Sequence, residues 1–263
     1  MATLGFIGTG NMGGAMARAA AKTKSNNILL ANRHPEKAMA LAREIGADVC
    51  DNVSVAEGAD FIFLGVKPQM LGEMLGEIAG ALKSRKTGYT LVSMAAGVSI
   101  DRIYDMLDFE PSVIRIMPNT PAAIGEGMIL YASKNVTDEQ VDVFLQAMKG
   151  AGRFSALDEK LIDAGSSVSG CGPAFAAMFI EALADGAVAC GLPRARALEY
   201  AAQMTAGTAK LMLETGAHPG AMKDAVCSPG GTTIQGVRTL EEAGFRGAVM
   251  DAVIASYEKT LEL

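Results

Sequence analysis

The sequence is short of the residues on which several kinds of active site depend. Its 263 residues include only two histidines, His34 and His218, both typical of surface or capping positions, and no pair of cysteines has the Cys-x-x-Cys spacing. We therefore expect no metal site, no redox-active cysteine pair and no histidine-based mechanism. Scattered cysteines indicate a reducing, cytoplasmic environment; they are Cys50, Cys171, Cys190 and Cys227.

The chain also has no net positive charge and no long uninterrupted apolar run. The formal net charge is −6, which gives no electrostatic case for binding nucleic acid or an anionic membrane. No basic segment precedes an apolar run at the start, so we expect neither a signal peptide nor a membrane span. Residues 174–192 are apolar and alanine-rich, but Glu181 and Asp185 interrupt them, which favours a buried helix.

What the chain does contain is the composition of a folded globular protein. Half of its residues are hydrophobic, 30 are glycine, and no low-complexity tract occurs. Apolar strand-like runs alternate with helical patterns up to about residue 160 and then vanish. We predict an α/β N-terminal Rossmann-type dinucleotide-binding domain at 1–160, followed by an all-α C-terminal domain at 161–263.

The first strand-to-helix junction has the pattern that binds a dinucleotide. The apolar run "TLGFIG" leads into "TGNMGGAMARAAAK", so Gly8-x-Gly10-x-x-Gly13 lies where a strand turns into a helix. Gly8 would make the tight turn, Gly10 would let the backbone approach a pyrophosphate, and Gly13 would let the helix pack closely on the strand. The helix N-terminus would then face the phosphates.

The next strand, at 27–31, indicates which nicotinamide cofactor binds. An NAD-specific site would have a carboxylate at its tip, whereas this chain has Asn32 and then Arg33. A guanidinium can bind the 2′-phosphate of NADP(H) through two hydrogen bonds. We therefore expect NADP(H), with NAD(H) as the alternative; the other reading is that Arg33 and Lys37 only begin a solvated helix.

Three more apolar runs, at 59–68, 89–97 and 112–121, predict strands whose tips border the same cleft. Their ends read "GVKP", "SMAAG" and "MPNTP". Ligands of such sheets bind beyond the carboxyl ends of the strands. The predicted cofactor-binding residues are Gly8, Thr9, Gly10, Asn11, Met12, Gly13, Asn32, Arg33, Asn52, Val66, Lys67, Pro68, Ala95, Ala96, Gly97 and Asn119.

After 135–152, which reads as a helix with Thr137 as its N-cap, the chain predicts mainly helices. One follows a Ser/Gly cluster, with Pro173 near its start, and others cover 192–216, 218–227, 232–243 and 244–263. Gly191 and Gly216 are expected to end helices. Several of these helices are apolar on more than one side, which a domain of about 100 residues could not bury. We expect a partner subunit to cover them.

Taken together, the motifs resemble those of the pyrroline-5-carboxylate reductase family. The similarity rests on "GFIGTGNMGGAMARA", "VKP", "SMAAGVSI", "VIRIMPNTP", "LIDAGSSVSGCGPAF" and "KDAVCSPGGTTIQGVRTLEE" and covers essentially the whole chain. Two departures are visible: Cys171 and Phe175 stand where the family usually has Ser and Tyr, so a hydroxyl role there is in doubt.

The resemblance implies hydride transfer from a nicotinamide to the imine carbon of L-1-pyrroline-5-carboxylate, giving L-proline. It also implies a homodimer of interlocked C-terminal helices, able to stack into a decamer, with each site completed across the dimer interface. The residues agree with this chemistry. A protonated cyclic imine accepts hydride readily and needs placement, a cradle for its carboxylate and a polar partner for its nitrogen.

The segment "VCSPGGTTIQG" at 226–236 is the predicted substrate site. Ser228 and the backbone N–H groups of residues 230–232 would bind the carboxylate at a helix N-terminus. By the family motif, Thr233 would hydrogen-bond the ring nitrogen, so Thr233 and Ser228 are the predicted catalytic residues. The substrate-binding set is Val226, Ser228, Gly230, Gly231, Thr232 and Thr233. A tight turn between helices with a serine cap is the plainer reading.

Two other functions remain open. A β-hydroxyacid dehydrogenase of the 3-hydroxyisobutyrate type has a similar opening motif, but it resembles an enzyme with a lysine on the helix after the nucleotide domain, and the helix at 173–190 contains none. A non-catalytic NADP(H) sensor is compatible with the first half of the chain. The "SPGGTT" segment favours a working substrate site over a sensor.

Overall fold

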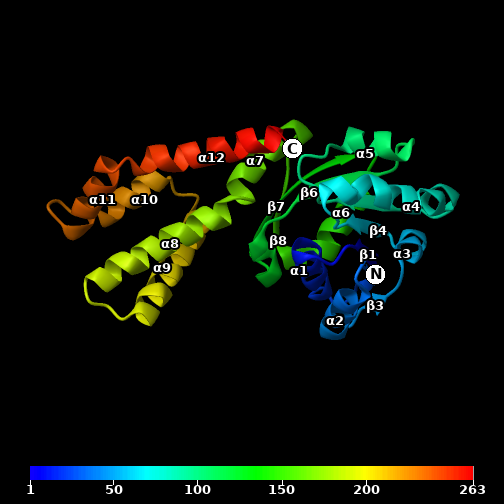
Figure 1. Cartoon of the computed structure of the whole chain (residues 1–263). Helices are drawn as coiled ribbons and strands as arrows, with labels where there is room; N and C mark the ends of the chain where they lie inside the picture. The colour runs from blue at the N-terminus through cyan, green and yellow to red at the C-terminus, as the bar shows by residue number, and fades with distance from the viewer. Residues whose placement is uncertain (263) are drawn as a thin grey trace. The chain divides into compact units, whose positions relative to one another are not determined.

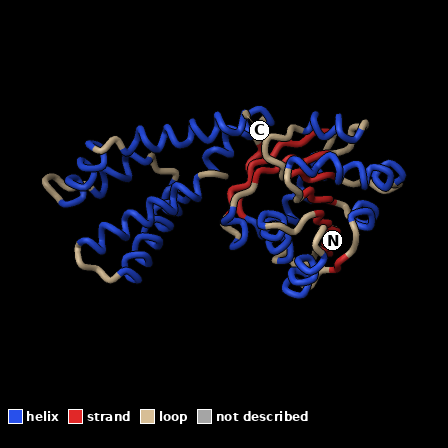
Figure 2. Tube along the Cα trace, in the orientation of Figure 1, coloured by secondary structure: helices blue, strands red, loops and turns tan. Residues whose placement is uncertain are grey.

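The computed structural model describes residues 1–262 and divides the chain into two compact units. Unit 1 comprises Met1–Cys171 together with the end of the last helix from Ser256, and unit 2 comprises Gly172–Ala255. Every strand of the described chain lies in unit 1, whereas unit 2 consists of helices (Figures 1 and 2). The predicted change from α/β to all-α is thus present, and the unit boundary falls eleven residues after position 160, behind helix α7 (Glu159–Ser169).

Unit 1 is built on one sheet with the strand order β3-β2-β1-β4-β5-β6-β7-β8. The first six strands are all parallel and follow the 3-2-1-4-5-6 order of a Rossmann fold. β7 runs antiparallel to β6 and parallel to β8. The strands are β1 (Thr3–Ile7), β2 (Asn27–Ala31), β3 (Asp48–Val49), β4 (Phe61–Leu64), β5 (Thr90–Ser93), β6 (Val113–Met117), β7 (Gly127–Lys134) and β8 (Gly152–Ala156).

Helices cover both faces of this sheet because the central strands are apolar on both sides. On one face α1 (Asn11–Ala21), α2 (Pro35–Ile45) and α6 (Asp138–Met148) pack on a cluster that includes the stacked rings of Phe6 and Phe63. The other face is covered by α3 (Asn52–Gly58), α4 (Leu71–Ser84) and α5 (Ile100–Leu107). Short 3₁₀ turns lie at Pro68–Met70, Thr120–Ile124 and Lys149–Ala151.

The predicted N-cap of α6 is confirmed. Thr137 Oγ1 accepts a hydrogen bond from the Gln140 backbone N–H at 3.2 Å, and Gln140 Oε1 accepts one from the Thr137 N–H at 2.8 Å. This reciprocal pair satisfies two backbone donors that a helix N-terminus leaves free. It fixes the start of a helix whose Phe144 reaches the core of the first face.

α7 is held to the sheet by a buried cation. The side chain of Arg115, on β6, is 3% exposed and forms ion pairs with Asp163 at 2.6 Å and Glu159 at 3.4 Å. Glu159 also accepts a hydrogen bond from the backbone N–H of Ile100, the first residue of α5, at 2.7 Å. One guanidinium therefore joins the middle of the sheet to α7, and through Glu159 to α5.

Unit 2 consists of α8 (Gly172–Ala189), α9 (Arg194–Thr215), α10 (Pro219–Val226), α11 (Thr232–Glu242) and most of α12 (Phe245–Leu261). The predicted stop at Gly216 is confirmed, since this residue caps α9 with a φ of 65°. The residues buried in unit 2 are three alanines, Ala184, Ala197 and Ala201.

The prediction that 174–192 forms a buried helix is wrong for the single chain. α8 buries only Ala184: it packs against α9, and its Phe179 ring lies 5.9 Å from that of Phe245 on α12, but these contacts do not cover its remaining surface. Large apolar side chains therefore stay exposed on α8 and α12, among them Met178, Met250 and Ile254. The stretch Glu159–Ala189, which is α7 and α8 together, is long and apolar enough, by length and composition, to cross a membrane; a window of 18 residues within it has a mean hydropathy of 1.3.

Candidate functional site

A cavity of about 620 Å³ lies at the carboxyl ends of β1, β2 and β4. This is the edge of a doubly wound sheet at which ligands bind. Seven of the predicted cofactor-binding residues line it, and they come from the ends of these three strands and from the start of α3: Gly8, Gly10, Asn32, Arg33, Asn52, Val66 and Lys67.

The turn between β1 and α1 is possible only with glycines. Gly8 has a φ of 96°, and a Cβ on it would lie 2.6 Å from the carbonyl oxygen of Gly65 at the end of β4. A Cβ on Gly13 would overlap the carbonyl oxygen of Gly8. Strand and helix therefore touch through bare backbone, as the first and third motif glycines predict.

The N-terminus of α1 fits a pyrophosphate. Gly10 is its N-cap, no side chain caps this end, and a Cβ at Gly10 would meet nothing within 4 Å. The first N–H groups of the eleven-residue helix therefore point, together with the positive end of its dipole, toward open space beside the cavity. A phosphate that binds there would approach the backbone without meeting a side chain.

Asn32 shapes the site with its side chain. Its Oδ1 accepts a hydrogen bond from the Thr9 backbone N–H at 3.0 Å, and its Nδ2 donates to the His34 carbonyl at 2.9 Å. The tip of β2 is thereby tied to the phosphate turn. Arg33 is exposed at the cavity and makes no ion pair with any residue in the described range 1–262, so its guanidinium is available to an anion.

Other predicted cofactor residues lie near this edge without lining the cavity. Asn11, Met12 and Gly13 are in the first turn of α1, Pro68 begins the 3₁₀ turn after β4, and the segment 95–97 follows β5. Thr9 is buried, and its hydroxyl has no hydrogen-bond partner. Asn119 is 8% exposed, and its side-chain amide is engaged by Ser169 and Met128.

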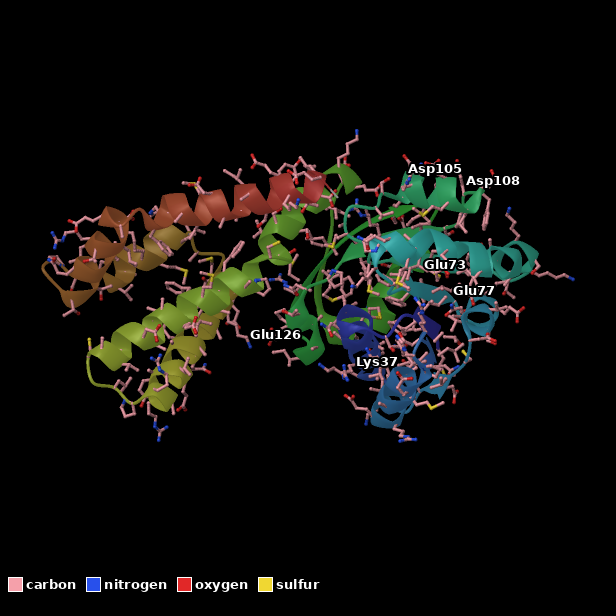
Figure 3. All side chains as sticks on the ribbon, viewed as in Figure 1. Lys37, Glu73, Glu77, Asp105, Asp108 and Glu126 are labelled. Atoms are coloured by element: carbon pink, nitrogen blue, oxygen red, sulfur yellow. The ribbon has the colours of Figure 1, made fainter. Side chains whose placement is uncertain are left out.

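Sequence reasoning missed an acidic side of the cavity. Glu73 and Glu77 project from α4 one turn apart (Figure 3), and Glu77 accepts a hydrogen bond from Asn52 Nδ2 at 2.8 Å. Asp51 also lines the cavity; its side chain accepts from the Ser54 backbone N–H, which lowers the pKa of the carboxyl. The spacing of four residues between Glu73 and Glu77 was the available signal, since it would place both side chains on one side of a helix.

Cys50 is a further lining residue that the motifs did not indicate. Burial raises the pKa of its thiol, and the carboxylates of Asp51 and Asp48 raise it further. The thiol is therefore mainly protonated near neutral pH, which makes Cys50 a slow nucleophile at the wall of the cavity.

The predicted substrate segment forms the link between α10 and α11 in unit 2. α10 ends at Val226, and the turn closes through a hydrogen bond from the Gly231 N–H to the Ser228 carbonyl at 3.0 Å. Gly230 has a φ of 68°, and a Cβ on Gly231 would overlap the Ser228 hydroxyl oxygen. The backbone of this turn therefore favours glycine at position 230, whereas Gly231 leaves room for the Ser228 hydroxyl.

The N-terminus of α11 is as bare as that of α1. Gly231 is the N-cap of this eleven-residue helix, and no side chain caps it. Thr232 and Thr233 are exposed in its first turn, whereas Ile234 and Val237 are half-buried, as the predicted stripe requires; Leu240, the third residue of that stripe, is 44% exposed. Ser228, Thr232 and Thr233 therefore bring three hydroxyls to a helix end with free N–H groups. The Gly231 N–H is engaged within the turn, so it is less available to a ligand than predicted.

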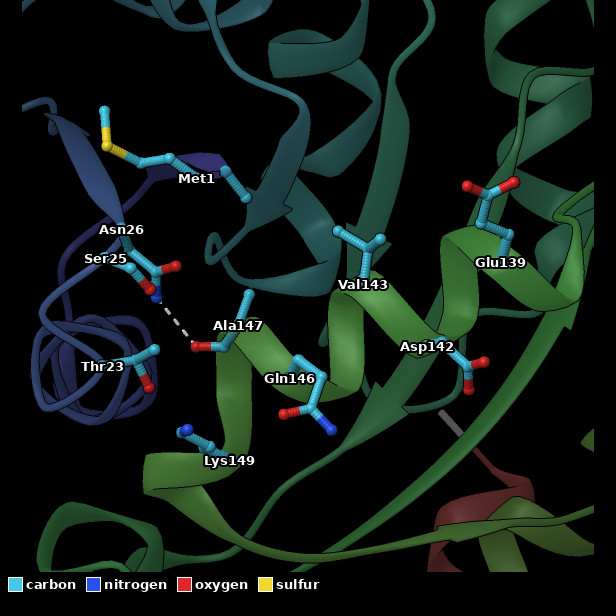
Figure 4. Close-up of a pocket in the computed structure, with 11 residues that line it drawn as sticks. Met1, Thr23, Ser25, Asn26, Glu139, Asp142, Val143, Gln146, Ala147 and Lys149 are labelled. Atoms are coloured by element: carbon cyan, nitrogen blue, oxygen red, sulfur yellow. Dashed lines mark hydrogen bonds between the residues drawn. The ribbon is translucent and has the colours of Figure 1, made fainter.

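A second cavity, of about 370 Å³, lies at the opposite, amino-terminal edge of the sheet (Figure 4). Asn26 Nδ2 donates to the Ala147 carbonyl there at 2.8 Å, and Glu139, Asp142 and Lys149 lie on its rim. Its polar groups come from helix α6 and from the loop before β2, not from a phosphate-binding turn. In the described residues 1–262, no group of three or more His, Cys, Asp or Glu side chains could hold a metal ion.

Two family models match the chain. Residues 159–263 match the pyrroline-5-carboxylate reductase dimerisation region, and residues 3–97 match the NADP oxidoreductase, coenzyme F420-dependent family. The pyrroline-5-carboxylate reductase of Escherichia coli (strain K12) is 42% identical over 265 residues, which cover 99% of this chain and 97% of that protein.

Solved structures give the same result. Plasmodium falciparum pyrroline carboxylate reductase with NADP bound superposes with a TM-score of 0.88 at 30% identity, covering 99% of this chain and 97% of the other. The pyrroline-5-carboxylate reductase of Coxiella burnetii has a TM-score of 0.90 at 28% identity, with 99% and 98% covered.

Proposed function

Because the chain belongs to the pyrroline-5-carboxylate reductase family, we propose how its own residues carry out that reaction. The protein reduces L-1-pyrroline-5-carboxylate to L-proline, the last step of proline biosynthesis, and NADP(H) is its cofactor. The observation that carries this assignment is the 42% identity to a relative of that name over 99% of the chain.

The cofactor is held along the carboxyl edge of the sheet in unit 1. The N-terminus of α1 receives the pyrophosphate, because Gly10 leaves it open. Arg33 binds the 2′-phosphate; its exposure at the cavity and its lack of an ion pair in the described chain support this role. Lys67 adds a second positive charge at the end of β4. NAD(H), which lacks that phosphate, would lose the Arg33 contact and bind more weakly.

The substrate carboxylate binds at the turn before α11. The Ser228 hydroxyl and the N–H groups at the start of the helix donate to it, and the helix dipole favours its negative charge. Gly230 contributes the left-handed turn, and Gly231 leaves space for the Ser228 hydroxyl beside the start of α11. Val226 and Thr232 complete the substrate-binding segment on either side of the turn.

Thr233 acts on the ring nitrogen. When bound, the reduced nicotinamide supplies a hydride to the imine carbon of the substrate. The Thr233 hydroxyl accepts a hydrogen bond from the protonated nitrogen and so keeps the proton there while the C=N bond becomes a C–N bond. As the C=N bond is reduced, the nitrogen loses its positive charge and gains a lone pair, to which the Thr233 hydroxyl can then donate. Because this hydrogen bond forms only late in the step, it stabilises the transition state more than the ground state.

The helical half forms a homodimer. Unit 2 buries three alanines and leaves large apolar side chains exposed, and residues 159–263 match a dimerisation region. A second copy of the chain, rather than lipid, covers the apolar stretch Glu159–Ala189, and each active site is completed across that interface. We extend this proposal to dimers that stack into a decamer and to a cytoplasmic location, with no membrane or nucleic-acid partner.

A steady-state assay tests the function. The protein should oxidise NADPH in the presence of the imine, and should reduce NADP⁺ with L-proline but not with 3-hydroxyisobutyrate. NADPH binding without turnover of either substrate would contradict the enzyme assignment and favour a sensor. Turnover of 3-hydroxyisobutyrate alone would point to a β-hydroxyacid dehydrogenase. Sedimentation should show a dimer or larger assembly at micromolar concentration; an active, stable monomer would refute the dimer.

A further inference from the structure

The backbone carbonyl of Ser169 has lost its helical partner. In a continuous helix it would accept a hydrogen bond from the N–H of residue 173, but that residue is Pro173, which has none. Asn119 Nδ2 takes the place of this donor, at 2.9 Å from the Ser169 oxygen. A side chain from another part of unit 1 therefore fills a gap in the backbone ladder.

The helix loosens at the same point. The N–H groups of Gly170 and Cys171 both donate to the carbonyl of Ser166, at 2.7 and 3.1 Å. The second of these bonds spans five residues instead of four, which marks an unwound turn. Proline and such wide turns are the usual causes of a helix kink. α7 and α8 are consequently two helices rather than one.

Asn119 is firmly held where it acts. It follows β6 by two residues, at the edge of the sheet that carries the cofactor cavity, and is 8% exposed. Its Oδ1 accepts from the Met128 N–H at 3.0 Å, and its backbone carbonyl accepts from the Ala122 N–H at 3.1 Å. Because Oδ1 faces an N–H donor, Nδ2 must face the Ser169 carbonyl.

The bonded carbonyl is at the place where the chain leaves unit 1. The boundary between the units falls between Cys171 and Gly172, two residues after Ser169. A Cβ on Gly172, the first residue of unit 2, would meet no atom within 4 Å. The bond from Asn119 therefore holds the chain just before it first passes between the units; the chain passes between them a second time within α12.

We propose that Asn119 is a positioning residue for the reduction: by holding the Ser169 carbonyl it fixes the direction in which the chain enters the unit that carries the substrate segment. The proposal rests on the proposed function, in which unit 1 holds the cofactor and Ser228 and Thr233 of unit 2 hold the substrate. A released hinge leaves both binding surfaces intact, but the reacting atoms meet in line less often.

Asn119→Asp isolates this bond. The carboxylate keeps an acceptor for the Met128 N–H and replaces the donor to Ser169 with a group that repels its carbonyl. We expect kcat to fall about tenfold, while KM for the imine and the Kd for NADPH change less than twofold. Asn26→Asp is the matched control, since Asn26 Nδ2 also donates to backbone carbonyls of unit 1, those of Ala20 and Ala147. Asn26→Asp should lower the melting temperature without a selective fall in kcat.

Pro173→Ala supplies the missing N–H at position 173, so it acts on the same carbonyl. Asn119→Asp should then cost much less in the Pro173→Ala background than in the wild type. Independent, multiplying effects would overturn the proposal. So would an Asn119→Asp variant with weakened NADPH binding and normal kcat, because that result would make Asn119 a cofactor ligand.

Hydrogen exchange tests the hinge without activity. In Asn119→Asp the amides of residues 170–172 should exchange about tenfold faster than in the wild type, with the sheet of unit 1 unchanged. Unchanged exchange at 170–172 would overturn the proposal. If the wild type fails to reduce the imine, the proposed function is refuted, and exchange at this segment still decides whether Asn119 holds the hinge.

Discussion

Gly231 lies so close to Ser228 that a side-chain carbon at position 231 would overlap the Ser228 hydroxyl oxygen. The position of the Ser228 hydroxyl therefore depends on the absence of a Cβ at position 231. Gly231→Ala should push the hydroxyl away from the start of α11 and raise KM for the imine about tenfold, which corresponds to ~1.4 kcal/mol. Its Kd for NADPH, measured by fluorescence titration, should stay unchanged. Normal imine kinetics in the variant would remove Ser228 from the carboxylate site.

The charge at the tip of β2 should determine cofactor preference. Arg33→Asp replaces the proposed partner of the 2′-phosphate with a repelling carboxylate, and a lost charged hydrogen bond alone is worth ~1.5–3 kcal/mol. The variant should lose NADPH affinity by at least tenfold and retain NADH affinity. The ratio of kcat/KM values for the two cofactors measures this, and Lys37→Asp, which changes the same charge on exposed α2, is the control. An unchanged ratio in Arg33→Asp would mean that Arg33 does not contact the phosphate.

Substitutions of Thr233 and Ser228 should change different kinetic constants. Thr233→Ala removes the partner of the ring nitrogen during hydride transfer, so kcat/KM should fall by roughly one to two decades, mainly through kcat. Ser228→Ala should chiefly raise KM, because the carboxylate is present equally in ground and transition states. Both residues are exposed, so the melting temperature should hardly change. A Thr233→Ala variant with wild-type kcat/KM would exclude Thr233 from the mechanism.

Arg115 should be important for stability. Arg115→Met leaves Glu159 and Asp163 without their cation; because both carboxylates are about one-quarter exposed, we expect a loss at the lower end of the range for broken buried pairs, about 3 kcal/mol. Urea unfolding measures the loss. Arg102→Met, an exposed arginine on α5, should cost less than 0.5 kcal/mol by the usual behaviour of surface sites. Equal losses in the two variants would show that the ion pairs of Arg115 do not contribute to the free energy of unfolding.

The rate at which the Cys50 thiol is alkylated should indicate whether cofactor occupies the cavity. Its raised pKa means that alkylation should accelerate only at higher pH than for a free cysteine, since the thiolate is the reactive form. NADPH should slow alkylation of Cys50 and leave the exposed Cys190 unaffected, because only Cys50 lines the cofactor cavity. Peptide mass spectrometry after N-ethylmaleimide treatment distinguishes the two cysteines. Equal protection of both would indicate a global effect instead of occupancy of the cavity.

The central sheet was predictable because its strands are apolar runs bounded by glycine or proline. Five of the eight strands follow from that pattern. β3 has only two residues, and β7 and β8 extend the sheet beyond the nucleotide-binding pattern, where local sequence does not reveal the pairing partner. α7 runs through the Ser/Gly cluster at 165–170, because its contacts with β7 outweigh a weak helix propensity.

A site residue could be predicted from the sequence where the reason for its identity lies in the adjacent residues of the chain. Gly8 and Gly13 are fixed by the turn that they make, so the motif located them. Glu73 and Glu77 face the cavity because of the way in which α4 lies on the sheet, which no local pattern encodes. The bond from Asn119 to Ser169 joins positions 50 residues apart and depends on a kink that Pro173 alone does not specify.

The buried core of unit 2 is only three alanines, so its refolding should depend on how often two chains meet. Unit 1 has a large apolar interior of its own and can collapse as soon as the chain is released from denaturant. On the proposal that a second chain covers the exposed apolar side chains of unit 2, its helices reach full stability only after two chains associate. Recovery of activity should therefore follow second-order kinetics, with a half-time inversely proportional to protein concentration, while the half-time for formation of the sheet should not depend on concentration.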